Sequence, residues 1–181
     1  MEIVHVHQQK FEKLVSAQQI SEAVKRMGKE LNERFAEHDT PPLFLCILNG
    51  AFMFAADLVR ELNFDNHMCF VKLSSYAGDA STGEVTEVLG LNQSIENRDV
   101  IIVEDIVDTG LTIENTIQTL RAKGPASVSV ATIFLKPEAF NEKVKLDHVG
   151  IELPNRYLVG YGLDFDGLGR HYKDVYGRIE E

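Results

Sequence analysis

Hydrophobic positions along the chain follow two patterns in turn, helical spacing and short uninterrupted apolar runs. Between residues 16 and 38, apolar side chains recur every three or four positions, which predicts an amphipathic helix. Ser16 and Gln19 form a capping-box pattern at the start of this segment. Helical spacing returns over residues 51–62 and 111–123, and Gly124-Pro125 ends the second of these segments.

Short apolar runs separate the helical segments, and we expect them to form buried strands. They are rich in Val, Ile and Leu without polar alternation, which is typical of parallel strands covered by helices on both faces. The predicted strands are residues 43–48, 70–73, 98–104, 127–135, 149–153 and 157–161. Right-handed crossover connections follow, so the expected fold class is α/β with a central, mostly parallel sheet flanked by helices.

Open sheets of this kind bind ligands beyond the carboxyl ends of their strands. In this chain that rule indicates Asn49-Gly50, the loop after Glu104 and the region around Lys136. The segment SSYAGDASTGEV, residues 74–85, is small, polar and glycine-containing, so it predicts a mobile loop.

Composition and charge narrow the function classes. The chain has 181 residues and a mass of 20.3 kDa, which fits one domain over residues 1–181. Its net charge of −10 makes it a poor general binder of nucleic acid or anionic membranes, so any phosphate must be bound locally. Cys46 and Cys69 lie in apolar runs and are expected to be buried thiols. With no signal-peptide pattern at its start, we expect a cytoplasmic protein with no membrane or nucleic-acid partner.

The strongest chemical signal is VIIVEDIVDTGLT, residues 100–112. A buried strand delivers Glu104 and Asp105, and Asp108 follows in a turn-rich loop, 105–110, that leads into a helix. Helix N-terminal amides beside Thr hydroxyls form a cradle suited to a phosphate. The adjacent carboxylates can hold ribose hydroxyls or a hydrated magnesium ion, and Asp108 is a candidate proton acceptor in this acidic cluster.

Two other interpretations of this segment stay open at this point. Asp and Thr before a helix are good N-caps, so the loop could be structural, although capping does not explain three clustered carboxylates. Asp108-Thr109-Gly110 also matches the active-site string of aspartic proteases. Those enzymes need two such aspartates in a β-rich fold, whereas this chain alternates strands and helices.

The segment resembles the phosphoribosyl-diphosphate signature of type I phosphoribosyltransferases. Further segments narrow the resemblance to the purine salvage branch, the hypoxanthine-guanine phosphoribosyltransferase family. They are LNGA (48–51), SSY (74–76), STGE (81–84), FLKP (134–137), YLVGYGLD (157–164) and Arg170. The resemblance implies that family's fold, with a small hood formed from the terminal segments beside the sheet.

The resemblance also implies a reaction, displacement of diphosphate from phosphoribosyl diphosphate by N9 of a purine. Asp108 would be the general base at the purine N7 proton, and Glu104 and Asp105 would contact the ribose 2- and 3-hydroxyls with magnesium nearby. The 5-phosphate would be wrapped by Asp108, Thr109, Gly110, Leu111 and Thr112.

On the base side, the resemblance implies that Lys136 reaches the purine O6 and that Tyr157 stacks on the ring. Main chain near Leu158 and Asp164 would read the purine 2-position. Taken alone, Lys136 could be a solvated strand end and Tyr157 could be core packing.

On the diphosphate side, the resemblance implies contacts from the Gly50 amide and Arg170. Many relatives carry Lys where this chain has Asn49, which supplies dipoles instead of charge. A cis peptide is expected between Leu48 and Asn49 by resemblance. Ser75 and Tyr76 would belong to a lid that closes over the substrates.

Magnesium is the cofactor that the resemblance implies, with Glu104, Asp105 and Asp164 as its ligands. The expected partners are phosphoribosyl diphosphate, 6-oxopurine bases and further copies of this chain in a dimer or tetramer. An alternative is a regulator on the same fold that senses phosphoribosyl diphosphate. Such a regulator would be expected to carry a basic face, which a net charge of −10 argues against.

Overall fold

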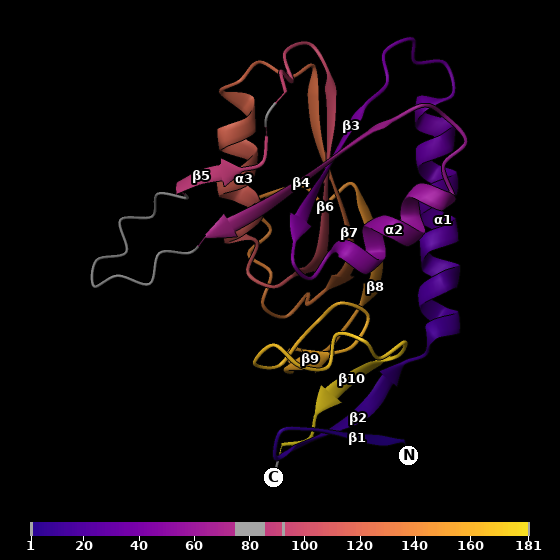
Figure 1. Cartoon of the computed structure of the whole chain (residues 1–181), viewed down its shortest axis with the longest axis vertical. Helices are drawn as coiled ribbons and strands as arrows, with labels where there is room; N and C mark the ends of the chain where they lie inside the picture. The colour runs from indigo at the N-terminus through magenta and orange to yellow at the C-terminus, as the bar shows by residue number, and fades with distance from the viewer. Residues whose placement is uncertain (1, 75–85, 92, 181) are drawn as a thin grey trace.

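The computed structural model describes residues 2–74, 86–91 and 93–180. A six-stranded sheet with the order β5-β4-β3-β6-β7-β8 forms the centre of the molecule (Figure 1). Its strands are β3 (Leu43–Leu48), β4 (His67–Ser74), β5 (Thr86–Leu89), β6 (Asp99–Val107), β7 (Ser127–Leu135) and β8 (His148–Glu152). Five of them, β4-β3-β6-β7-β8, run parallel, and β5 pairs antiparallel with β4. This arrangement confirms the predicted sheet.

Helices cover both faces of this sheet. α1 (Ala17–Phe35) and α2 (Phe52–Arg60) pack on one face, and α3 (Leu111–Arg121) packs on the other (Figure 1). Alternate residues of β3 supply both layers, because Phe44 packs in the core with α1 and α2 while Leu45 packs in the core with α3. Burial on both faces explains why the strands are apolar without alternation.

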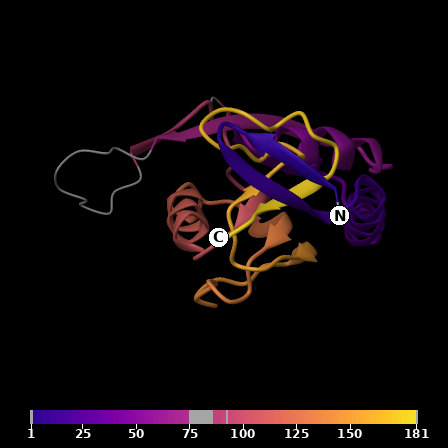
Figure 2. The ribbon, with the colours of Figure 1, turned by 90° about the horizontal axis from the view of Figure 1, so that it is seen from below.

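A second, four-stranded sheet has the order β1-β2-β10-β9, and we call it the hood. Its strands are β1 (Ile3–Val6), β2 (Gln9–Val15), β9 (Leu158–Val159) and β10 (Val175–Arg178). Both ends of the chain therefore contribute to it, as the family resemblance implied. The hood lies beyond the end of the large sheet to which β3 points, and Figure 2 looks onto it from below.

The start of α1 is tied to the hood. Ser16 is the N-cap, and the predicted capping box with Gln19 is present. The next backbone amide, of Ala17, donates a hydrogen bond of 2.6 Å to Asp174, which directly precedes β10. Lys13 on β2 forms an ion pair of 3.0 Å with the same carboxylate. This carboxylate therefore joins the hood to the first turn of the helix.

The structure differs from the sequence expectations in three places. β6 continues to Val107, so Asp105 lies in a strand and not in the predicted loop, because Ile106 and Val107 pair with β7. The strand predicted over 157–161 shortens to β9, because Gly160 takes a positive φ of 103°. Hood strands β1, β2 and β10, and strand β5 of the large sheet, were not predicted. Within the described ranges, none of the helices has the length and apolar character needed to cross a membrane.

Candidate active site

The two acidic residues of the central strand, Glu104 and Asp105, differ in their surroundings. Glu104 is buried, with 7% of its surface exposed, and its Oε1 accepts the Asp105 amide at 3.3 Å. Burial, followed by the neighbouring Asp105 carboxylate, raises the pKa of Glu104 well above its ordinary value. Among the described residues, no Lys, Arg or His forms an ion pair with either carboxylate.

This acidic pair creates a negative field at the carboxyl end of the sheet. Burial, then Glu104 and Asp105, raise the pKa of the nearby Cys46 thiol on β3 to about 12. Both cysteines are free and buried, as expected. A negative field that the described protein cations do not neutralise suits hydroxyl donors or a bound cation.

The Asn49-Gly50 loop packs directly against Asp105. A Cβ atom at Gly50 would overlap the Asp105 carboxylate, and one at Gly162 would overlap the Gly50 carbonyl oxygen. The expected cis peptide between Leu48 and Asn49 is present. The loop after β3 is therefore held between the central strand on one side and the segment after β9 on the other.

The predicted phosphate loop leads from β6 into α3. Gly110 is the N-cap of α3, has a left-handed φ of 88°, and makes no side-chain capping bond. The interpretation of Asp108 or Thr109 as the N-cap residue is therefore wrong. Thr109 Oγ1 accepts the Leu111 amide at 3.4 Å, and a Cβ at Gly110 would press on the Phe140 ring. With no side chain at the N-cap, the first turn of α3 can offer its amides to a phosphate.

Lys136 and Asp108 meet although 28 residues separate them. The ammonium nitrogen of Lys136 lies 2.9 Å from Asp108 Oδ2, and the two side chains are 12% and 49% exposed. Their backbones are also joined, because the Lys136 amide donates to the Val107 carbonyl at 3.0 Å. Lys136 is therefore not a solvated strand end, and its cation lies beside the candidate base.

Tyr157 directly precedes β9 and has 48% of its surface exposed, which excludes the core-packing interpretation. Its ring meets Phe165 edge to face with centroids 5.1 Å apart. Arg178 lies over the Tyr157 ring at 5.7 Å, while Leu158 is buried. The contact with Phe165 fixes the ring, and the exposed part of Tyr157 remains available for stacking.

Asp164 and Arg170 are paired with each other beside the hood. Arg170 Nη2 lies 2.6 Å from Asp164 Oδ1, and its Nη1 donates to the Gly162 carbonyl at 2.7 Å. The second Asp164 oxygen accepts the Gly167 amide at 2.7 Å. Through Gly162, this pair is in contact with Gly50 and hence with Asp105.

Comparison with known proteins places this geometry in a family. The sequence pattern of the phosphoribosyl transferase domain matches residues 11–166. The chain belongs to the phosphoribosyltransferase family. It is 38% identical over 153 residues to the hypoxanthine-guanine phosphoribosyltransferase of Bacillus subtilis, a match that covers 84% of each chain. It is 35% identical over 167 residues to that of Mycobacterium avium, covering 90% of this chain and 81% of the relative.

Solved structures agree with the sequence relatives. A crystal structure of a hypoxanthine phosphoribosyltransferase from Staphylococcus aureus superposes with a TM-score of 0.85 at 32% identity, covering 93% of this chain and 91% of that chain. The hypoxanthine phosphoribosyl transferase of Trypanosoma cruzi superposes with a TM-score of 0.87 at 30% identity, covering 97% and 95%. The type I phosphoribosyltransferase fold expected from the resemblance is thus confirmed.

The carboxylates of this phosphoribosyltransferase are oxygen ligands of the kind that magnesium takes. In the described part of the chain, no three His, Cys, Asp or Glu side chains gather around a metal position. Magnesium commonly takes one or two carboxylates and completes its shell with water and substrate phosphates. Glu104 with Asp105 would hold one ion and Asp164 a second. Bound there, magnesium would neutralise charge on the diphosphate leaving group.

Some site residues escaped prediction, and others remain untested. The backbone of Gly162 touches the Asn49-Gly50 loop, and the Gly-Tyr-Gly pattern at 160–162 was the available signal. Ser75 and Tyr76 lie outside the described residues, as does nearly all of the predicted mobile loop. Glu104 and Asp105 lie in the carboxyl-terminal half of β6, and Leu111 and Thr112 lie in the first turn of α3. The remaining predicted residues lie in the loops that follow β3, β6 and β7, or in the segment from Tyr157 to Arg170 that contains β9.

Proposed function

We propose that this phosphoribosyltransferase transfers the 5-phosphoribosyl group from phosphoribosyl diphosphate to hypoxanthine or guanine. The products are IMP or GMP and diphosphate, with xanthine left open as a third acceptor. N9 of the purine forms the new bond to the anomeric carbon. The bond to diphosphate breaks, the leaving group keeps its electron pair, and the N7 proton of the purine passes to Asp108.

The observation that carries the proposal is the Lys136–Asp108 pair at 2.9 Å. A carboxylate can accept a proton, and an ammonium group has three donors and no acceptor. Side by side, the two groups match the N7–H and O6 of a 6-oxopurine. Adenine would place an amino donor against the Lys136 donor, so the same pair disfavours 6-aminopurines.

The residues around this pair would bind the other parts of the donor. The first turn of α3 would hold the 5-phosphate, and Glu104 and Asp105 would hold the ribose hydroxyls. The Gly50 amide, Asn49 and Arg170 would contact the diphosphate, where this chain lacks the lysine common at position 49. To reach the diphosphate, Arg170 would break its ion pair with Asp164. The Asp164 carboxylate would then be free to hold magnesium.

The proposal also covers the state of the protein in the cell. We infer a single-domain cytoplasmic enzyme that forms a dimer or tetramer. Free, buried Cys46 and Cys69 support a reducing compartment, and fusion to a fluorescent protein tests the location. Sedimentation of the purified protein at several concentrations distinguishes dimer from tetramer.

The deciding experiment incubates the protein with phosphoribosyl diphosphate, magnesium and one purine base at a time. Chromatography then measures the nucleotide formed. We expect hypoxanthine and guanine to give nucleotide and adenine to give almost none. Absence of product with every 6-oxopurine would overturn the proposed function, and efficient use of adenine would overturn the role of Lys136.

A further inference from the structure

Tyr161 lies in a constrained turn between β9 and Asp164. Its backbone has a left-handed φ of 48°, which is uncommon for a residue with a side chain, and 7% of its surface is exposed. The flanking glycines have no room for a Cβ atom, since Gly160 abuts the Asp174 carbonyl and Gly162 abuts the Gly50 carbonyl. The turn is thus wedged between the hood and the loop after β3.

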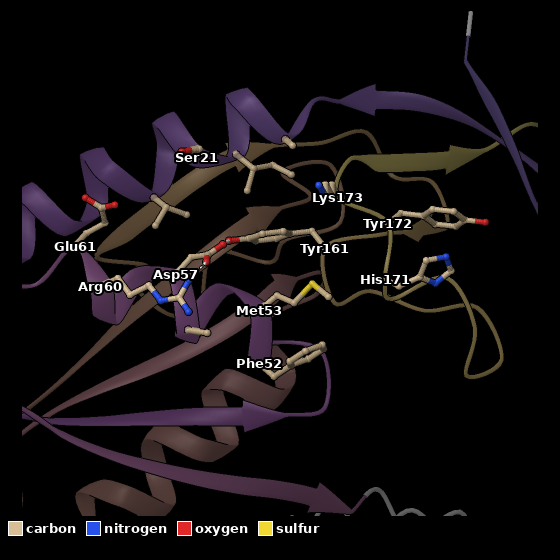
Figure 3. Close-up of a pocket in the computed structure, with 14 residues that line it drawn as sticks. Ser21, Phe52, Met53, Asp57, Arg60, Glu61, Tyr161, His171, Tyr172 and Lys173 are labelled. Carbon is tan, nitrogen blue, oxygen red and sulfur yellow. Dashed lines mark hydrogen bonds and ion pairs between the residues drawn. The ribbon is translucent and has the colours of Figure 1, made fainter.

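The Tyr161 side chain reaches out of the hood to α2. Its hydroxyl donates a hydrogen bond of 2.8 Å to Asp57 Oδ2 (Figure 3). Burial, then the Asp57 carboxylate, raise the pKa of Tyr161, so the hydroxyl stays protonated and able to donate. The ring also packs edge to face on Phe134 of β7, with centroids 6.3 Å apart. Ring and hydroxyl therefore make separate contacts.

Asp57 and Tyr161 line one side of a cavity of about 630 Å³ between α1, α2 and residues 171–173 (Figure 3). Asp57 is 48% exposed, with Arg60 3.7 Å from its Oδ1. Of the predicted substrate-binding residues that the structure describes, none lines this cavity. The hydrogen bond thus lies behind the site and is not a substrate contact.

We infer that Tyr161 and Asp57 form a positioning pair that fixes the hood segment carrying Asp164 against the Asn49-Gly50 loop. α2 begins directly after this loop, and the Phe52 amide hydrogen-bonds to the Asn49 carbonyl at 3.4 Å. Gly162, which touches Gly50, is adjacent to Tyr161 in the chain. The pair therefore joins the two segments that would contact the diphosphate, an inference that rests on the proposed function.

Loosening this connection should affect the binding of phosphoribosyl diphosphate more than the chemical step. Asp108 and Lys136 directly follow the paired strands β6 and β7 and are joined by their own ion pair, and neither depends on the Tyr161 hydroxyl. The expected signature is a higher KM and Kd for phosphoribosyl diphosphate, by about 5- to 50-fold, with kcat within about threefold. A purely structural role would lower stability without this split.

Tyr161→Phe tests the inference because it keeps the ring and removes the hydroxyl. Asp57→Ala removes the acceptor, and Asp57→Asn retains an oxygen that can accept the same hydrogen bond. Tyr176→Phe is the matched control, since it also removes one tyrosine hydroxyl, whose hydrogen bonds are to Glu2 at 2.9 Å and Asp174 at 3.4 Å and not to α2 or the Asn49-Gly50 loop. Kinetics, calorimetric Kd for phosphoribosyl diphosphate with magnesium, and thermal unfolding are measured for each variant.

We expect Tyr161→Phe and Asp57→Ala to raise KM and Kd alike. The KM and Kd of the double variant should be no higher than those of the single variant with the larger effect. The values for Asp57→Asn should stay near wild type. A Kd for Tyr161→Phe within twofold of wild type would overturn the inference. So would an equal effect of Tyr176→Phe, or equal damage by Asp57→Asn and Asp57→Ala. If the wild type formed no nucleotide, the proposed function would fail, and the Kd values alone would decide the inference.

Discussion

Glu104 is a carboxyl group buried in the central strand next to a second carboxyl group, Asp105. Because its pKa is raised, the charged form of Glu104 lowers the free energy of unfolding of the protein at neutral pH. The neighbouring field raises the pKa of Cys46 as well. A purely structural strand would be more stable with an apolar or amide side chain here. The acidic pair is therefore best explained as a binding device.

Glu104→Gln should stabilise the protein and weaken binding of phosphoribosyl diphosphate. The pKa of Glu104 is higher in the folded than in the unfolded protein. Its contribution to the free energy of unfolding is therefore most favourable below the ordinary pKa of 4.5, and this contribution is lost as pH rises through the folded-state pKa. The difference in melting temperature should grow with pH, by about 2–4 °C per kcal/mol recovered. Thermal unfolding between pH 4 and 8 measures it. A variant less stable than wild type at pH 8 would contradict this prediction.

Asp108→Asn keeps the size of the side chain and removes the proton acceptor. We expect kcat to fall by about 10²–10⁴ while the Kd for phosphoribosyl diphosphate changes much less. The exposed Asp65→Asn, on the surface before β4, is the control and should match wild type. Single-turnover kinetics with hypoxanthine provide the measurement. Turnover within twofold of wild type would remove Asp108 from the mechanism.

Lys136→Ala removes the donor proposed for the purine O6. A hydrogen bond to a charged group contributes about 1.5–3 kcal/mol, so kcat/KM for hypoxanthine should fall by roughly 10- to 150-fold. The rate with adenine should fall less, which narrows the discrimination between the two bases. Parallel assays with both bases measure the ratio. An unchanged ratio would show that Lys136 does not read the 6-position.

At the scale of elements, the first turn of α1 depends on a residue from the other end of the chain. Asp174 accepts the Ala17 amide at 2.6 Å and pairs with Lys13 of β2 at 3.0 Å. The pKa of Asp174 is lowered, because the Ala17 amide and Lys13 outweigh the opposing effect of burial. Helix, strand and hood are thus joined at one carboxylate.

Asp174→Ala should lower the free energy of unfolding by about 0.5–2 kcal/mol at pH 7, the usual range for a lost helix cap. A lowered pKa means that the contribution of Asp174 is present above its ordinary value of 3.8 and is lost as pH falls through the folded pKa. The difference from wild type should therefore shrink toward pH 3. Urea unfolding at both pH values tests it. A difference that stays constant would show that the Asp174 charge does not contribute.

Elements whose stability is local were predictable from the sequence. The capping box of α1, the apolar run of β3 and the bounds of β7 all match the structure. β6 was extended, because pairing with β7 recruits Ile106 and Val107 after two acidic residues that had suggested a strand end. Hood strands were missed, since they are short and pair segments from opposite ends of the chain.

In the site, too, features within one segment were predictable, and contacts between distant segments were not. The phosphate loop and Lys136 were identified because each lies in a contiguous motif at a strand end. Contacts such as Gly162 against Gly50, or Tyr161 with Asp57, were not identified, because they join the hood to the sheet layer across more than 100 residues. A glycine chosen for close backbone approach looks in the sequence like a glycine in any turn.

At the scale of the whole molecule, an acidic chain has to bind a polyanion. The net charge is −10, and the acidic pair at the end of β6 faces no described protein cation. Arg170 is already paired with Asp164, and Lys136 with Asp108. Phosphoribosyl diphosphate adds further negative charge between these groups. For the proposed reaction, electrostatics therefore favours cations from solution at the site, whereas the fold is held together by its apolar cores.

Removal of magnesium should abolish activity and leave the fold intact. With excess chelator, we expect nucleotide formation to stop and to return on adding magnesium, while the melting temperature of the free protein stays within about 1 °C because the apolar cores hold the fold. Phosphoribosyl diphosphate at 100 times its Kd should raise the free energy of unfolding by about 2.7 kcal/mol when magnesium is present. The same concentration should have almost no effect in chelator, because the anion then meets Glu104, Asp105 and Asp164 without a bridging cation. Thermal unfolding with and without each component separates these effects. Equal stabilisation by phosphoribosyl diphosphate in chelator would show that the site binds the donor through its own residues and that the magnesium assignment is wrong.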